Sequence, residues 1–96
     1  MANTNYLTST VLLLEAPNLE WEQDRLIRME LRAVLPERKE NKLVHLVIWG
    51  ELGNRNLEVF QPYQYLLLEG FFSLLSQTNS KTKKFQITAV KIYPIF

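Results

Sequence analysis

The side chains of this sequence that could do chemistry are mostly basic. They fall on one expected strand and in two expected loops. Arginine and lysine in such an arrangement can follow the phosphates of a nucleic acid. They are Arg28 and Arg32 on the strand, Arg38, Lys39 and Lys42 in the first loop, and Lys81, Lys83 and Lys84 in the second.

Acidic neighbours favour a second interpretation of these basic residues. Glu30 lies between the two arginines, and Glu37 and Glu40 lie in the first loop, so the charges can pair with one another on a solvated face. The second loop has no acidic residue nearby in sequence and is the better phosphate candidate, although a lysine run is also typical of a solvated loop. Both interpretations remain open.

Trp49 is the aromatic side chain with the clearest chemical use. It lies on the face of its expected strand opposite the apolar Val44, Leu46 and Ile48, which indicates exposure to a groove. A base that stacks on such a side chain gains about 1–3 kcal/mol. The alternative is that Trp49 packs over a helix or at a subunit interface, because tryptophans are highly buried on average.

Several classes of chemistry lack the residues they need. The chain contains no cysteine and one histidine, His45, which excludes thiolate chemistry and disfavours histidine metal sites. Its isolated glycines form no phosphate-binding loop. A net charge of +1 does not by itself indicate a polyanionic partner. We predict no enzyme activity, no cofactor, no metal site and no small-molecule substrate.

The length and hydropathy of the chain indicate one compact domain. The 96 residues suffice for a single core, so we expect one domain spanning residues 1–96. No apolar run is long enough to span a membrane, and the polar start at Met1–Asn5 does not resemble a secretion signal. These features favour a soluble, intracellular protein.

The expected elements are five strands and one short helix. Alternation of apolar and polar residues is clearest in Leu26–Val34, where Met29 and Leu31 share one face and Arg28 and Arg32 the other. The strands are Tyr6–Leu14, Leu26–Val34, Leu43–Trp49, Tyr65–Leu75 and Phe85–Ile92, and the helix is Glu51–Phe60. With the helix between the third and fourth strands, this order predicts an all-β, five-stranded OB-fold barrel.

Three further positions carry structural expectations. Asn18–Asp24 is interpreted as a turn, in which Trp21 forms a structural cap on the barrel. Gly70, inside a strand, indicates sharp coiling at a barrel corner. Phe71 and Leu75 face away from the core and predict a covered surface between subunits, with base stacking on Phe71 as the alternative.

Three segments, in order and with matching spacing, carry a family resemblance over nearly the whole chain. They are Val11-Leu-Leu-Leu-Glu-Ala-Pro17, Leu46-Val-Ile-Trp-Gly-Glu-Leu52 and Tyr65-Leu-Leu-Leu-Glu-Gly-Phe71. Together they resemble the bacterial single-stranded-DNA-binding protein family. The Trp-Gly pair and the ending Tyr93-Pro94 are most similar to short homologues of cyanobacteria and plastids.

The resemblance implies a homo-oligomer, a dimer or a tetramer, that binds single-stranded DNA with little sequence preference. RNA remains open as a second ligand. Trp49 matches a stacking position of the family, and His45 stands where the family commonly has arginine. Leu43 replaces a further family tryptophan. The implied location is the bacterial cytoplasm or the plastid stroma.

A different class of function fits the weak charge and the missing stacking residues. In this alternative the chain is an OB-fold interaction or assembly module that has lost nucleic-acid binding and docks on a larger protein complex. The cyanobacterial likeness would place that complex at the periphery of a photosynthetic membrane.

Overall fold

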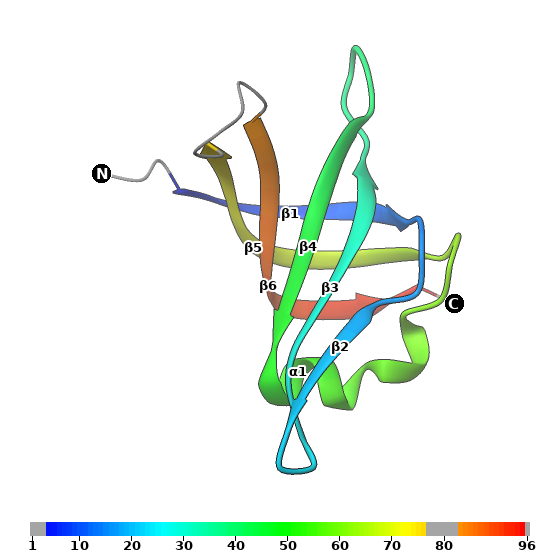
Figure 1. Cartoon of the computed structure of the whole chain (residues 1–96). Coiled ribbons are helices and arrows are strands. Elements are labelled where there is room, and N and C mark those ends of the chain that lie inside the picture. The colour runs from blue at the N-terminus through cyan, green and yellow to red at the C-terminus, as the bar shows by residue number, and fades with distance from the viewer. Residues whose placement is uncertain (1–3, 77–82, 96) are drawn as a thin grey trace.

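The computed structural model describes residues 4–76 and 83–95. The described chain is mostly β-structure, with one short helix and one 3-10 turn (Figure 1). The strands are β1 (Thr4–Leu13), β2 (Asn18–Glu22), β3 (Arg25–Leu35), β4 (Lys42–Trp49), β5 (Tyr65–Ser76) and β6 (Lys83–Pro94). The helix α1 (Gly50–Arg55) and the 3-10 turn η1 (Leu57–Val59) lie between β4 and β5.

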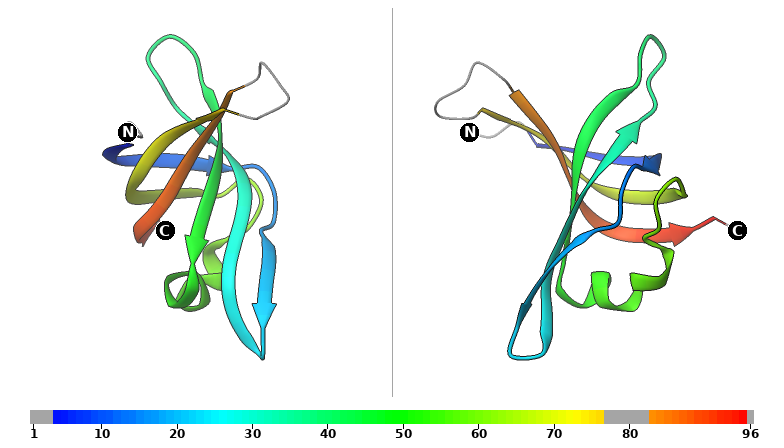
Figure 2. Two further views of the ribbon diagram at one scale, coloured as in Figure 1. Left: turned by 60° about the vertical axis from the view of Figure 1, so that its left-hand side comes forward. Right: turned by 45° about the vertical axis from the view of Figure 1, so that its right-hand side comes forward.

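The strands form one sheet that turns back on itself. Its order is β1-β5-β6-β4-β3-β2, and β1 also pairs with β3 through Leu12↔Val34 and Leu13↔Ala33. Only the β4–β6 pairing is parallel among the strand pairs of the described chain. The β2–β3 hairpin projects past the closed part of the sheet, next to α1 (Figure 2).

The inner face of this sheet carries the core, as the alternation in the sequence predicts. Met29 and Leu31 of β3 face Leu46 and Ile48 of β4, and each of these side chains is at most 1% exposed. Full burial of one such side chain stabilises the fold by about 1.5–3 kcal/mol. The same alternation sends the polar residues of β3 and β4 to the outer face.

Gly70 lies at a bulge in the long β5–β6 pair, where both strands bend (Figure 1). A Cβ at this position would lie 2.3 Å from the backbone oxygen of Thr88. The corner therefore requires glycine, in agreement with the coiling that we expected there.

The predicted turn at residues 18–24 is wrong, because Asn18–Glu22 forms β2 and pairs with β3. The turn is confined to Gln23 and Asp24, which both have positive φ, as a tight hairpin requires. The sheet consequently has six strands rather than five, and the helix follows the fourth strand rather than the third. Trp21 does not cap the core, since it is 50% exposed on β2.

The predicted helix Glu51–Phe60 is also too long. α1 ends at Arg55, and the side-chain amide of Asn56 donates a hydrogen bond of 2.7 Å to the carbonyl oxygen of Leu52. This bond satisfies a carbonyl group at the end of the helix. Phe60 is buried after η1, as expected.

Candidate nucleic-acid interface

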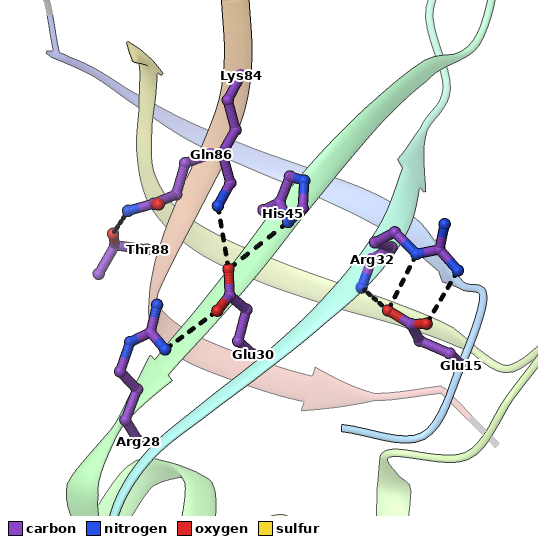
Figure 3. Close-up of polar contacts among 8 residues, drawn as sticks. All are labelled: Glu15, Arg28, Glu30, Arg32, His45, Lys84, Gln86 and Thr88. Carbon is purple, nitrogen blue, oxygen red and sulfur yellow. Dashed lines mark hydrogen bonds and ion pairs between the residues drawn. The ribbon is translucent and has the colours of Figure 1, made fainter. Parts of the chain in front are cut away.

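The outer face of β3, β4 and β6 gathers the candidate residues of the sequence. The β3–β4 register places Arg28 opposite Trp49, Glu30 opposite Val47 and Arg32 opposite His45. Lys84 reaches the same face from β6 (Figure 3). Residues from three strands that lie far apart in sequence therefore share one surface.

Trp49 ends β4 and is 53% exposed. The guanidinium carbon of Arg28 lies 5.6 Å from the centroid of its ring, a cation–π contact. The next residue, Gly50, has a φ of +54°, a left-handed conformation that favours glycine and turns the chain into α1. Trp49 thus stands at the rim of the sheet with about half of its surface open to solvent.

Glu30 lies at the centre of this face and contacts a basic residue from each strand (Figure 3). Its Oε2 is 3.1 Å from Nη1 of Arg28, and its Oε1 is 3.2 Å from Nζ of Lys84 and 3.6 Å from Nδ1 of His45. About a quarter to a third of each of these side chains is exposed. We call Arg28, His45 and Lys84 the basic triad.

The pKa values of Glu30 and His45 reflect this packing. Burial alone would raise the pKa of Glu30, but the hydrogen bond from Lys84 and the charge of Arg28 hold it below its usual value. Burial and then the charge of Lys84 lower the pKa of His45. Glu30 is therefore ionised and His45 is neutral at neutral pH.

Arg32 is engaged by an acidic residue outside the triad. Glu15, in the loop between β1 and β2, accepts hydrogen bonds from the backbone nitrogen, Nε and Nη2 of Arg32 at 2.8, 3.2 and 3.1 Å. These hydrogen bonds and the arginine charge lower the pKa of Glu15. The two-pronged contact fixes the orientation of the guanidinium group.

The remaining basic candidates lie toward the other end of the sheet. Arg38 and Lys39 are exposed in the loop between β3 and β4. Lys42 is the first residue of β4 and not the last residue of the loop. Its Nζ lies 3.3 Å from Oε1 of Glu37 and 4.6 Å from the ring centroid of Phe85. Lys81 and the side chain of Lys83 lie outside the described residues.

The prediction that Lys84 belongs to the second loop is wrong, and an acidic residue that is distant in sequence lies beside it. Lys84 belongs to β6, and its ammonium group contacts Glu30, which is 54 positions away in the sequence. Only the β4–β6 pairing brings the two together, so no local pattern could show it.

Phe71 and Leu75 lie on the outer side of β5, as expected, and are 45% and 41% exposed. The ring of Phe71 lies 5.2 Å from that of Tyr6 on β1, whose hydroxyl donates a hydrogen bond to Glu69. Tyr6 was not among the predicted residues, although it too alternates with the buried positions of its strand. An apolar, partly aromatic patch thus continues the outer face beyond β6.

Trp21 lines a second surface feature, on the opposite side of the sheet. Its β3 partner is the buried Leu26, whereas the partner of Trp49 is the outward-facing Arg28. Trp21, Arg25, Glu51 and Asn54 border an open cleft of about 430 Å³ between the hairpin and α1. The two tryptophans of the chain therefore report on different surfaces.

The described residues, 4–76 and 83–95, contain neither a metal-ligand cluster nor a helix that could span a membrane. No group of three or more histidine, aspartate or glutamate side chains there is placed to hold a metal ion. None of the helices in this part of the chain has the length and apolar character to cross a membrane.

Comparison with known proteins gives matches among solved structures. No family model and no curated protein matches the sequence. The SSB domain of a protein from Synechococcus sp. aligns with a TM-score of 0.65 and 18% identity, over 93% of each chain. The chain has the fold of single-stranded-DNA-binding proteins.

Two further solved structures agree with this assignment of the fold. The second single-stranded DNA-binding protein of Mycobacterium smegmatis gives a TM-score of 0.69 at 16% identity, over 93% of this chain and 86% of its own. The small single-stranded DNA-binding protein of Streptomyces coelicolor gives 0.69 at 12% identity, over 97% and 95%. The family resemblance in the sequence is thus confirmed at the level of the fold.

Proposed function

We propose that this chain is a non-catalytic protein that binds single-stranded DNA with little sequence preference. The observation that carries the proposal is the exposed indole of Trp49 beside Arg28 on the outer face of a sheet with this fold. Binding of this kind combines base stacking on aromatic rings with positive charge along the backbone. In this proposal the closed sheet acts as an OB-fold barrel.

Each candidate residue has a defined part in the proposed interface. Trp49 stacks on a base. The basic triad and Arg32 lie along the phosphates of the single-stranded DNA where it crosses β3, β4 and β6. Arg38, Lys39 and Lys42 extend the positive surface at the β3–β4 loop, and Lys81 and Lys83 are assigned the same role.

The apolar patch around Phe71 supports a second part of the proposal, a homo-oligomer. Phe71 and Leu75 are large, apolar and close to half exposed on one strand, and the ring of Tyr6 lies beside Phe71. Large exposed apolar patches are uncommon on monomeric proteins. We assign these two residues to contacts between subunits, in a dimer or a tetramer.

One observation favours the alternative of a protein-docking module. Glu15 contacts Arg32, and Glu30 contacts all three residues of the basic triad, which reduces the charge available to phosphates. A docking module predicts affinity for a protein complex that is insensitive to salt and to Trp49, but sensitive to Phe71 and Leu75.

A direct binding measurement decides between the two functions. A fluorescently labelled thymidine oligonucleotide, which has little secondary structure, is titrated with the protein at low and at near-physiological salt, and anisotropy is recorded. Single-strand binding predicts saturable association that weakens steeply as salt rises. No association at low salt would refute the proposed function and leave the docking module.

A further inference from the structure

We propose that Glu30 occupies a phosphate-binding site formed by Arg28, His45 and Lys84, and that a backbone phosphate of a single strand displaces its carboxylate. The inference rests on the proposed function and concerns its regulation. Glu30 then determines the affinity of the protein for single-stranded DNA.

The geometry of the triad is that of an anion site. Nη1 of Arg28, Nδ1 of His45 and Nζ of Lys84 come from β3, β4 and β6 and all lie within 3.6 Å of one carboxylate group. A phosphate diester carries a single negative charge and accepts hydrogen bonds, as a carboxylate does. A group that fits these donors can therefore replace Glu30 without a rearrangement of the sheet.

The position of the site makes such an exchange possible. Glu30 is 26% exposed, so a ligand can reach the triad from solvent. Val47 lies beside Glu30 on the neighbouring strand, between Glu30 and Thr88, and is only 1% exposed, which gives the charges partly apolar surroundings. Arg28 also contacts Trp49, so a phosphate on the triad lies next to a base on the indole.

Competition also explains how a weakly charged chain can bind a polyanion reversibly. In the free protein the carboxylate already neutralises part of the positive charge. Bound single-stranded DNA gains the contacts with the triad, but its phosphate must displace the Glu30 carboxylate. The net gain for this one phosphate is consequently small, and the affinity is kept moderate.

The test compares Glu30→Gln with a matched variant, Glu58→Gln. Both changes raise the net charge by one unit, but Glu58 is exposed on η1 and not in contact with the triad. We expect Glu30→Gln to bind a thymidine oligonucleotide roughly three- to fivefold more tightly than the wild type at low salt, the effect of one partly exposed charge pair. Its plot of log affinity against log salt is expected to be steeper by about 0.7. Glu58→Gln should match the wild type within about twofold on the same scale.

The single histidine of the chain provides a second readout by NMR. His45 faces Lys84 of β6, Glu30 and Arg32 of β3 and Glu15 of the β1–β2 loop, and Glu30 is one of the groups that raise its pKa. The imidazole pKa is therefore expected to fall in Glu30→Gln and to rise again when the oligonucleotide is added. Inorganic phosphate is titrated separately; a response of His45 to phosphate but not to the oligonucleotide would overturn the proposal.

The outcomes separate the inference from the proposed function. If the wild type binds and Glu30→Gln binds equally well or no better than Glu58→Gln, the inference is wrong and single-strand binding stands. If Glu30→Gln binds and the wild type does not, no strand displaces Glu30 in the native chain, and both the inference and the proposed function are wrong. If no variant binds at low salt, both fail. Thermal melting verifies that each variant is folded, and Glu30→Ala replaces Glu30→Gln if the latter is not.

Discussion

Replacement of Trp49 by alanine tests the stacking role with a control that the chain itself supplies. The two tryptophans are almost equally exposed, at 53% for Trp49 and 50% for Trp21, but they lie on opposite faces of the sheet. Trp49→Ala and Trp21→Ala thus remove the same side chain from sites of similar exposure. Only the first removes it from the proposed interface.

The expected magnitude follows from one lost stacking contact. A base on an aromatic ring contributes about 1–3 kcal/mol, so Trp49→Ala should weaken the binding of a thymidine oligonucleotide by about 5- to 150-fold. The cost to folding combines the contact of the ring with Arg28, about 0.5–1 kcal/mol, with the loss of its buried half, about 1–2 kcal/mol. The Trp21→Ala variant should keep wild-type affinity.

Anisotropy of a labelled oligonucleotide measures this effect without relying on tryptophan emission. Urea unfolding of each variant verifies that differences in affinity do not arise from loss of the fold. Equal losses of affinity in Trp49→Ala and Trp21→Ala, or no loss in either, would refute the reasoning. A loss confined to Trp21→Ala would move the interface to the cleft beside α1.

Three further predictions concern the fold, the assembly and the dependence on pH. Gly70→Ala should lower the free energy of unfolding by about 1–3 kcal/mol or more in urea titrations, since its Cβ would collide with backbone atoms that cannot yield. Phe71→Ser combined with Leu75→Ser should shift the protein to monomers in sedimentation experiments, because the apolar contact between subunits is lost. The melting temperature should fall on acidification, because the pKa values of His45 and Glu30 are both lower in the folded chain than in the unfolded one. The contribution of His45 is complete above its ordinary pKa of 6.5 and declines below it, and that of Glu30 is complete above 4.5 and is lost below it.

Matched controls sharpen these predictions. Gly53→Ala places its Cβ 3.3 Å from flexible side-chain atoms of Met29, so it should cost less than Gly70→Ala. Tyr63→Ser removes a side chain that is 74% exposed and should leave the oligomeric state unchanged. In Glu30→Gln the decline of the melting temperature below pH 4.5 should become shallower. A monomeric wild type, or a melting temperature that rises on acidification, would contradict the respective prediction.

Alternating strands were predictable from the sequence because their cores depend on local patterns. In β3 the buried residues recur at every second position from Met29 onward, and Gly70 marked the corner of β5. In β4 the alternating Val44, Leu46 and Ile48 are buried, and Val47 is buried as well. β2 was missed although Leu19 and Trp21 alternate with polar residues, because its hairpin turn contains no glycine. The predicted helix was extended to Phe60, whereas Asn56 ends α1 with two hydrogen bonds, from its side-chain amide to Leu52 and from its backbone nitrogen to Gly53.

The candidate site was predictable only in part. Trp49 and the arginines of β3 are visible in the sequence because each lies on the polar face of its own strand. The contacts of Lys84 with Glu30 and of Arg32 with Glu15 depend on how strands and loops come together. The sequence showed that acidic residues were near the arginines, but not which of them would neutralise the lysine of β6.

The most direct test of the account is an NMR titration of the isotope-labelled protein with a thymidine oligonucleotide at low salt. The indole N–H signals of the two tryptophans observe the two faces of the sheet separately. We predict that the Trp49 signal, the imidazole of His45 and the backbone amides of β3, β4 and β6 shift during the titration, while the Trp21 signal stays in place. Shifts centred on Trp21, or no shift at either indole, would contradict the proposal that this face binds single strands.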